Sequence, residues 1–218
     1  MTDAKQRLTH LIELATADAP ENRRVLATEL CDLLLDWPPH YPAPMREPFE
    51  ALLEKTVRSI DADTRRALAA KLGTRDETPV ALLNEFYFDA GEDARDAIVL
   101  RNALVEGATD AQNATADEPA LIAAARSKPQ SEFTASFASL LGIEQATAES
   151  ILRDPTGRAL AVACKGAHLA RATFSALALL TETGAALQTA REKLASFDSV
   201  PLTGAERLLD FWRTRHAA

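Results

Sequence analysis

The sequence EPFEALLEKTVRSIDADTRRALAAKLG, residues 47–73, constrains the fold most, because it specifies two helices joined by a short turn. Glu47-Pro48 is typical of a helix start, where the missing N–H of proline costs little. Five apolar side chains then fall on one helical face, namely Phe49, Leu52, Leu53, Val57 and Ile60. Asp61-Ala-Asp63 interrupts this pattern and supplies a carboxylate acceptor for a second helix. We expect that helix over residues 64–72, with Gly73 at its end.

Parts of this pattern recur elsewhere in the first half of the chain. Thirty residues downstream, identical residues stand at five matching positions: Leu82, Leu83, Asp93, Arg95 and Ala97 correspond to Leu52, Leu53, Asp63, Arg65 and Ala67. Forty-one residues upstream, the similar residues are Leu11, Ile12, Glu13, Asn22 and Arg24. Each repeat is therefore a helix hairpin whose turn carries Asp or Asn, with Arg two residues later. Because one hairpin leaves apolar surface uncovered, such units stack against each other.

Composition also favours helices. Alanine and leucine are abundant, whereas aromatic residues make up only 6% of the chain. Strands need more β-branched and aromatic residues than this sequence has. We predict an all-α protein with HEAT-like stacked helical hairpins in residues 1–105, a polar connection in residues 106–118 and a compact helical bundle unit in residues 119–218. In the last unit we expect helices over residues 119–127, 131–141, 145–153, 155–165, 170–183, 185–196 and 203–215.

The second half carries a motif of the form LLGI…A…IL.D..G..LA..C…L…F, here Leu140-Leu-Gly-Ile143, Ala148, Ile151-Leu152, Asp154, Gly157, Leu160-Ala161, Cys164, Leu169 and Phe174. The hairpins of the first half resemble HEAT-like repeats. More closely, residues 20–185 resemble an uncharacterised bacterial family of all-helical proteins, a domain of unknown function that joins a HEAT-like first half to a helical second half. The resemblance implies a cytoplasmic helical protein and brings no reaction or catalytic residue with it.

The net charge of −8 is unevenly distributed. Residues 1–120 hold 13 Lys and Arg against 23 Asp and Glu, whereas residues 121–218 hold 11 against 9. This balance is ordinary for a soluble acidic protein, and it leaves the second half free to meet an acidic partner. It argues against nucleic-acid binding, which needs a dense basic surface. The apolar runs are too short for a membrane span and no secretory signal opens the chain, so we expect a cytoplasmic protein.

No local motif predicts a catalytic, cofactor or metal site. Cys31 and Cys164 lie in different halves and match no metal spacing, so we interpret them as buried free thiols. The four histidines are scattered, without a pair at i and i+4. In the stretch ILRDPTGRALAVACKGAHLARATF, residues 151–174, we interpret Asp154-Pro155 as a helix start and Cys164 as one residue of a helix's core face. For His168, in contrast, the sequence pattern of this stretch indicates no structural role.

The first candidate partner-binding segment is DWPPHYPAP, residues 36–44, which lengthens one period of the repeat. Its four prolines predict an extended backbone that displays Trp37, His40 and Tyr41. One interpretation is a stiff connector whose rings cover the end of a helix pair. The other is a rigid aromatic patch for a protein partner, because ordered Trp and Tyr lose little entropy on binding.

Two further segments contribute candidates. In NEFYFDAGEDARD, residues 84–96, three consecutive aromatic residues cannot all face one helical core, so Phe86 and Tyr87 are candidates for a partner or groove. The carboxylates of this segment do not have the spacing of a calcium loop, and we interpret them as capping and solvated groups. In the last helix, Trp212 belongs to an apolar band that predicts docking onto its own domain, a homodimer or partner contact, or an anionic membrane surface.

These observations predict a non-enzymatic cytoplasmic protein–protein interaction or regulatory adaptor on a helical-repeat scaffold. The partner is an unidentified protein, and a homodimer through the last helix is one possibility. The alternative is a small-molecule binding protein or an enzyme whose site lies between the two helical units. Its candidate residues are Phe86, Tyr87, Arg95, Arg101, Cys164 and His168.

Overall fold

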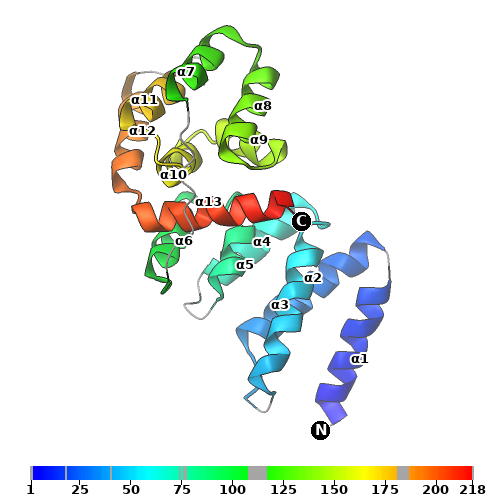
Figure 1. Ribbon diagram of the computed structural model, residues 1–218. Helices are drawn as coiled ribbons and strands as arrows, with labels where there is room; N and C mark the ends of the chain where they lie inside the picture. Colours follow the sequence, from blue (N-terminus) through cyan, green and yellow to red (C-terminus); the bar gives the residue numbers. More distant parts are fainter. Residues whose placement is uncertain are drawn as a thin grey trace. The chain divides into compact units, whose positions relative to one another are not determined.

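The computed structural model describes residues 2–17, 19–39, 41–73, 75, 78–107, 117–180 and 187–217. Within these ranges every regular element is a helix (Figure 1), so the all-α prediction is confirmed. The chain divides into two compact units, Met1–Ile98 and Val99–Ala218. The boundary falls inside one helix, Glu92–Leu104, whereas the sequence predicts it in the polar residues 106–118. Within the described ranges no helix has both the length and the apolar character needed to cross a membrane.

The first unit is a succession of short helices joined by tight turns. They are α1 (Thr2–Thr16), α2 (Pro20–Leu35), the 3-10 helix η1 (Ala43–Met45), α3 (Arg46–Val57), α4 (Ala62–Gly73), α5 (Val80–Glu85) and the first part of α6 (Glu92–Leu104). α2 packs against α1, α3 and α4, and α5 packs against α3 and α4. Fully buried leucines such as Leu30 on α2 and Leu53 on α3 form its core. The HEAT-like arrangement of these helices stays a prediction.

Asp61 begins α4 in the way the sequence predicts. Its carboxylate accepts hydrogen bonds from the backbone N–H of Thr64 at 3.0 Å and from the Thr64 hydroxyl at 2.8 Å. These bonds lower the pKa of Asp61 to about 2, and the guanidinium of Arg24 on α2, 2.7 Å away, acts in the same direction. Arg24 therefore links one repeat to the turn of the next.

Arg65, the arginine of the second repeat, holds three segments of the first unit together. Its guanidinium donates to the backbone carbonyl of Val57 at the end of α3 and to that of Glu85 at the end of α5, both at 2.9 Å. It also pairs with Asp89, in the turn before α6, at 2.7 Å. The guanidinium lies 5.7 Å from the centre of the Phe86 ring. These bonds satisfy carbonyls at two helix ends, which have no partner within their own helices.

Arg95, the matching arginine of the third repeat, has a similar environment. It donates to the backbone carbonyls of Phe88 and Ala90, both at 3.0 Å, and lies 5.6 Å from the centre of the Tyr87 ring. Arg65 and Arg95 therefore both bond backbone carbonyls at helix ends or in turns.

The consecutive aromatic residues after α5 are buried in a way that the helical interpretation does not allow. Phe86 and Tyr87 are each 1% exposed, and Phe88 is half-buried. α5 ends at Glu85, and Phe86 has left the helical conformation. Because these rings stand on a turn rather than on a helix, adjacent side chains can both point inward.

The second unit contains the helices that the sequence predicts, with shifted ends. They are α7 (Glu118–Ser127), α8 (Gln130–Leu141), α9 (Gln145–Arg153), α10 (Arg158–Gly166), α11 (Arg171–Leu180), α12 (Leu187–Ser199) and α13 (Leu202–Ala217). α10 is the central helix, in contact with α9, α11, α12 and α13. Residues 159–164 are therefore all between 0 and 3% exposed. The prediction that Cys164 lies in the core is confirmed, and residues on other faces of α10 are buried as well because neighbours surround the helix.

The start of α10 also differs from the prediction. The helix begins at Arg158 rather than at Pro155, because residues 154–157 form a turn. Gly157 makes this turn possible with a φ of 69°, a conformation that favours glycine. Asp154 still caps the helix, since its carboxylate accepts a hydrogen bond from the backbone N–H of Ala159 at 2.8 Å.

Polar side chains distant in sequence close helix ends in the second unit. Arg207 on α13 donates to the backbone carbonyls of Asn102 and Val105, at the end of α6. Glu118, at the start of α7, accepts hydrogen bonds from the backbone N–H of Ala170 and from the hydroxyl of Thr173, at the start of α11. Both contacts supply partners that the first and last turns of a helix lack.

Two glycines allow α13 to approach its neighbours closely. A Cβ on Gly166 of α10 would lie 2.5 Å from the carbonyl oxygen of Ala205 on α13. A Cβ on Gly204 of α13 would lie 2.3 Å from the carbonyl oxygen of Val99 on α6. Both neighbouring atoms belong to the backbone, so an alanine at either position requires the helices to move apart.

We expect Gly166→Ala and Gly204→Ala each to lower the free energy of unfolding by about 1–3 kcal/mol, because overpacking separates buried helices. Gly91→Ala is the matched control, since a Cβ on Gly91 would meet no described atom within 4 Å and the expected change is within about 0.5 kcal/mol. Urea unfolding followed by circular dichroism measures all three. Equal stability of the three variants would contradict the close packing of α13.

We expect Arg65→Gln to lower the free energy of unfolding by about 2 kcal/mol, because it removes charged hydrogen bonds and leaves half-buried carbonyls without their donor. Arg66→Gln, at the next position of α4, removes a 64%-exposed side chain and is expected to change stability by less than about 0.5 kcal/mol. Chemical denaturation of both variants tests this difference, and a loss of similar size in both would show that the contacts of Arg65 are not special.

Candidate functional site

The aromatic cluster of the first unit forms between the end of α2 and the start of α3. The Trp37 ring lies edge-on to Tyr41, with centroids 5.6 Å apart, and edge-on to Phe49 at 5.8 Å. The guanidinium of Arg46 lies 6.0 Å from the centre of the Trp37 ring. All four side chains are half-buried, so each combines fixed neighbours with an exposed part. We use "aromatic cluster" for Trp37, Tyr41, Arg46 and Phe49.

The backbone that carries this cluster is folded rather than extended. The backbone N–H of Tyr41 donates to the carbonyl of Pro38 at 2.9 Å, which closes a turn, and η1 follows at Ala43–Met45. The prediction of an extended proline-rich segment is therefore wrong. Proline fixes φ near −65°, which suits a turn as well as an extended chain, and the contacts of Trp37 with Phe49 and Arg46 favour the turn.

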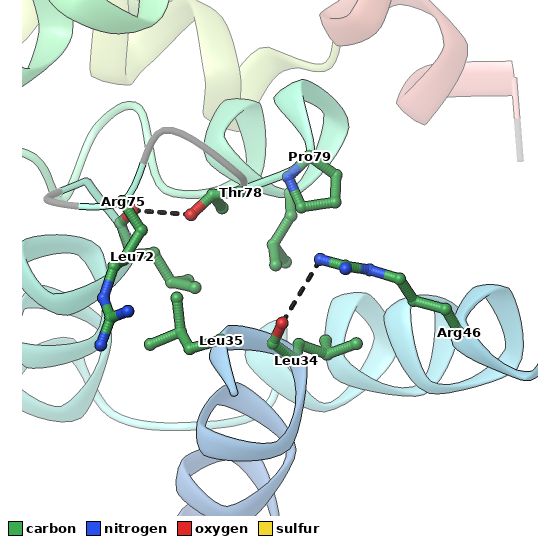
Figure 2. A pocket seen from close by; sticks show the side chains of 8 residues that line it. Leu34, Leu35, Arg46, Leu72, Arg75, Thr78 and Pro79 are labelled. Carbon is green, nitrogen blue, oxygen red and sulfur yellow. Dashed lines mark hydrogen bonds between the residues drawn. The ribbon is translucent and has the colours of Figure 1, made fainter. Parts of the chain in front are cut away.

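A small apolar hollow is lined in part by Arg46, which also belongs to the aromatic cluster (Figure 2). Its described lining consists of Leu34 and Leu35 of α2, Arg46 of α3, Leu72 of α4, Arg75, Thr78 and Pro79 of the following turn, and Leu82 of α5. Four helices thus contribute to one depression. Its volume of about 10 Å³ is that of roughly one water molecule, which is too small to enclose a metabolite.

Thr78 fixes the chain that turns past this hollow. It is 3% exposed, and its hydroxyl donates to the backbone carbonyl of Leu72 at 2.8 Å. Pro79 then precedes α5 in an extended conformation and lies against the hollow. The wall formed by this turn is therefore held by a buried hydrogen bond.

Two arginines flank the hollow from opposite sides. Arg46 donates from Nε to the Glu50 carboxylate at 2.8 Å and from Nη2 to the backbone carbonyl of Leu34 at 3.3 Å, the bond drawn in Figure 2. Arg75 lies 3.8 Å from the Asp36 carboxylate, and these side chains are 54% and 77% exposed. Arg46 is thus the more firmly held of the two, and it belongs to both the aromatic cluster and the hollow.

Sequence reasoning missed Arg46, Phe49, Arg75 and the hollow. The spacing of Arg46 and Glu50 at i and i+4 predicts a surface ion pair, but it does not indicate a ring beneath the guanidinium. The lining of the hollow comes from residues up to 48 positions apart, Leu34 to Leu82, which only tertiary packing brings together.

The structure describes five of the six predicted partner-binding residues. Trp37 and Tyr41 are adjacent and half-buried, whereas His40 lies outside the described residues. Phe86, Tyr87 and Trp212 are each 1% exposed, so their rings pack inside the protein and have almost no surface to offer a partner. The candidate surface is accordingly centred on Trp37 and Tyr41.

Part of the apolar band of α13 is also turned inward, whereas Leu202 is exposed and Phe211 is half-buried. Leu208 and Leu209 are fully buried with Trp212, and α13 packs against α10. This is the arrangement of a helix docked onto its own domain. A homodimer through the remaining surface of α13 stays a prediction.

The residues of the alternative site are divided between the units. Phe86, Tyr87 and Arg95 belong to the first unit, whereas Arg101, Cys164 and His168 belong to the second. Within the second unit, His168 has an unusual backbone φ of 56°, and its Nε2 lies 2.9 Å from the carboxylate of Glu206 on α13. This contact with Glu206 gives His168 a structural assignment, and the convergence of the six residues stays a prediction.

The two cysteines are buried and unpaired with each other, as the sequence predicts. Burial raises the pKa of Cys31 to about 11, and it raises the pKa of Cys164 further. Both therefore stay protonated at neutral pH, in the less nucleophilic thiol form. Among the residues that the structure describes, no group of histidine, cysteine and carboxylate side chains is arranged to hold a metal ion.

Residues 109–210 match the model of a family described as an uncharacterised protein conserved in bacteria (DUF2336). The predicted resemblance to an uncharacterised bacterial family is therefore confirmed for this segment. The segment differs from the expected residues 20–185, because the match lies in the second half of the chain and excludes the hairpins of the first. No curated protein and no solved structure matches the chain.

We expect neither thiol of the native protein to react with iodoacetamide at pH 8, because Cys31 and Cys164 are both fully buried with raised pKa values. In about 6 M guanidinium chloride, which unfolds the protein, both thiols are expected to react at the rate of an exposed cysteine. Mass spectrometry counts the adducts. Rapid labelling of either cysteine at pH 8 would contradict this environment.

The raised pKa of Cys31 also makes the stability of the fold depend on pH. Its contribution to the free energy of unfolding is fully present below the unfolded pKa near 9 and is lost as pH rises through the folded pKa of about 11.

Proposed function

We propose that the chain is a non-enzymatic cytoplasmic protein that binds a protein partner through the aromatic cluster, as an interaction or regulatory adaptor on a HEAT-like helical scaffold. Trp37 and Tyr41 provide the apolar contact area, and Arg46 provides charged hydrogen-bond donors. The bacterial family matched by the second half supports a bacterial setting for this adaptor.

The proposal rests on one observation: the half-buried side chains of Trp37, Tyr41 and Arg46 are held in place by contacts with one another. Tryptophan, tyrosine and arginine dominate the binding energy of many protein interfaces. In this cluster Trp37 contacts Tyr41, Phe49 and Arg46, so its ring is already fixed before a partner arrives. Binding then costs less side-chain entropy than it would for a freely moving ring.

The chemistry of the described residues supports binding over catalysis. The hollow has the volume of roughly one water molecule, so it cannot surround a small substrate. The thiols of Cys31 and Cys164 are buried and protonated, which disfavours them as nucleophiles. Surfaces assembled from successive helical repeats more often bind proteins or peptides.

We expect the double variant Trp37→Ala, Tyr41→Ala to lose at least about tenfold in partner recovery, because it removes the two aromatic rings that we propose contact the partner. Affinity purification of tagged wild type and variant from the native cytoplasm, followed by quantitative mass spectrometry, measures the difference. Circular dichroism and urea unfolding first establish that the variant is folded.

Phe211→Ala is the matched control, because Phe211 is a half-buried ring on α13 with the Arg215 guanidinium 5.8 Å from its centre. It removes an aromatic–arginine contact from the second unit and is expected to leave partner recovery unchanged. If the double variant and wild type recover the same proteins in the same amounts, the aromatic cluster is not the binding site.

A further inference from the structure

Resting on the proposed function, we infer that the aromatic cluster binds a basic segment of the partner, with a lysine or arginine side chain against the rings of Trp37 and Tyr41. Three features of the first unit lead to this chemistry. They are the half-buried rings, the charge at the end of α2 and the charge of the unit as a whole.

The rings of the cluster can receive a cation. Trp37 and Tyr41 are both half-buried, so part of each ring is open to solvent. The faces of aromatic rings carry negative charge and attract Lys and Arg side chains. The cluster already contains one contact of this kind, because the Arg46 guanidinium lies 6.0 Å from the centre of the Trp37 ring.

The end of α2 carries a charge that a cation would offset. The last carbonyl groups of a helix give its C-terminus a partial negative charge, which a nearby Lys or Arg stabilises. α2 has no basic residue in its last turn. It has Asp32 there instead, and Asp36 follows directly, next to Trp37 in the sequence. The helix end next to the rings is therefore more negative than a helix end favours.

Cations of other segments offset this charge only in part. Lys71 on α4 pairs with Asp32. Arg75 lies 3.8 Å from the Asp36 carboxylate, which is longer than a hydrogen bond, and the Asp36 side chain stays 77% exposed. Asp36 is thus open to a cation from a partner.

The start of α3 adds a second exposed carboxylate. Arg46 donates to Glu50 at 2.8 Å, so these two charges balance each other. Glu47, next to Arg46 in the first turn of α3, is exposed, and no side chain in the described part of the chain pairs with it. Carboxylates therefore exceed cations on the segment that holds the rings.

The charge of the whole unit acts in the same direction. Residues 1–98 contain 12 Lys and Arg against 19 Asp and Glu. Ion pairs within the unit leave this excess unchanged, because each pair removes one charge of either sign. An acidic surface attracts a basic segment during encounter and repels an anionic one.

Arg46 is compatible with a basic segment, because it can bond to the backbone of that segment. Its bonds to Glu50 and to the carbonyl of Leu34 use one N–H on Nε and one on Nη2. The other N–H groups of the guanidinium suit neutral acceptors such as backbone carbonyls. The side chains of the segment then supply the charge, and its backbone supplies the acceptors.

The test uses the full chain and a fluorescein-labelled synthetic peptide, Gly-Ser-Arg-Ala-Arg-Ser-Gly. Two matched peptides replace both Arg by Gln or both Arg by Glu. We expect the Arg peptide to bind at least about fivefold more tightly than either, because only its side chains gain from the rings and the carboxylates together. Fluorescence anisotropy measures the three affinities.

Carboxylate variants locate the binding on the chain. The double variant Asp36→Asn, Glu47→Gln is expected to weaken the Arg peptide about fivefold. The matched control is Glu13→Gln, Glu21→Gln, which removes the same charge from exposed positions on α1 and at the start of α2. We expect the control to bind within about twofold of wild type, because exposed charges farther than a Debye length are screened. Circular dichroism establishes that both variants are folded.

Tryptophan emission gives a second readout of the site. The chain contains two tryptophans, and Trp212 is 1% exposed and belongs to the second unit. In a Trp212→Phe background the emission therefore reports on Trp37 alone. We expect titration with an unlabelled Arg peptide to change this emission and titration with the Gln peptide to leave it unchanged.

Equal affinity for the Arg and Gln peptides, or tighter binding of the Glu peptide, would overturn the inference. Equal losses in the two double variants would also overturn it, since the attraction would then come from the unit as a whole rather than from the cluster.

The affinity purification separates this inference from the proposed function. We expect Asp36→Asn, Glu47→Gln to lower partner recovery, as Trp37→Ala, Tyr41→Ala does. Loss in the aromatic variant with full recovery in the carboxylate variant would overturn the basic partner and leave the binding site standing. Full recovery in the aromatic variant would reject the proposed function itself.

Discussion

The first unit depends on the guanidinium of Arg65. This side chain joins the end of α3, the end of α5 and the turn before α6 by bonds to Val57, Glu85 and Asp89. Planar guanidinium geometry with several fixed donors suits such a junction, where a lysine offers only a single charged tip. The hollow is lined by residues of α2, α3, α4 and α5, so its shape depends on how these helices are spaced. Arg65 lies on α4 and bonds the ends of α3 and α5, so it joins three of the four helices that line the hollow.

The second unit uses a different constraint, which is close backbone contact. Gly166 and Gly204 let α13 approach α10 and the end of α6 to distances that exclude a Cβ. The bonds of Arg207 to the carbonyls of Asn102 and Val105 then hold α13 against the end of α6. Both constraints are local and chemical, and neither requires the long apolar interfaces of a large core. They act beside the buried leucine and alanine side chains that fill the core of a chain with few aromatic residues.

The sequence predicted helix ends well where a glycine in the left-handed conformation ends the helix. The expected helices 131–141 and 145–153 correspond to α8 and α9, because Gly142 between them adopts a φ of 68°. The start of α10 was missed, since the pattern of Asp154-Pro155 does not reveal that three further residues form a turn before the helix. The burial of both Phe86 and Tyr87 was also missed, because it depends on α5 ending early.

The candidate site was predictable only in part for a similar reason. The residue types of the insertion indicate Trp37 and Tyr41, since prolines and rings stand together there. The partners of Trp37 and the hollow arise from packing between separate helices, which residue spacing does not encode. Repeat periodicity did locate Arg65 and Arg95, but it did not show that their role is to bond backbone carbonyls.

The central claim, that the aromatic cluster contacts a protein partner, is tested most directly by site-specific photocrosslinking in the native cell. A photoreactive benzoyl-phenylalanine replaces Tyr41 in the cluster or, as a control, Ser139 on the exposed face of α8. We expect a discrete crosslinked protein from the Tyr41 position that is absent from the Ser139 position. No adduct at Tyr41, or the same adducts from both positions, would contradict the claim.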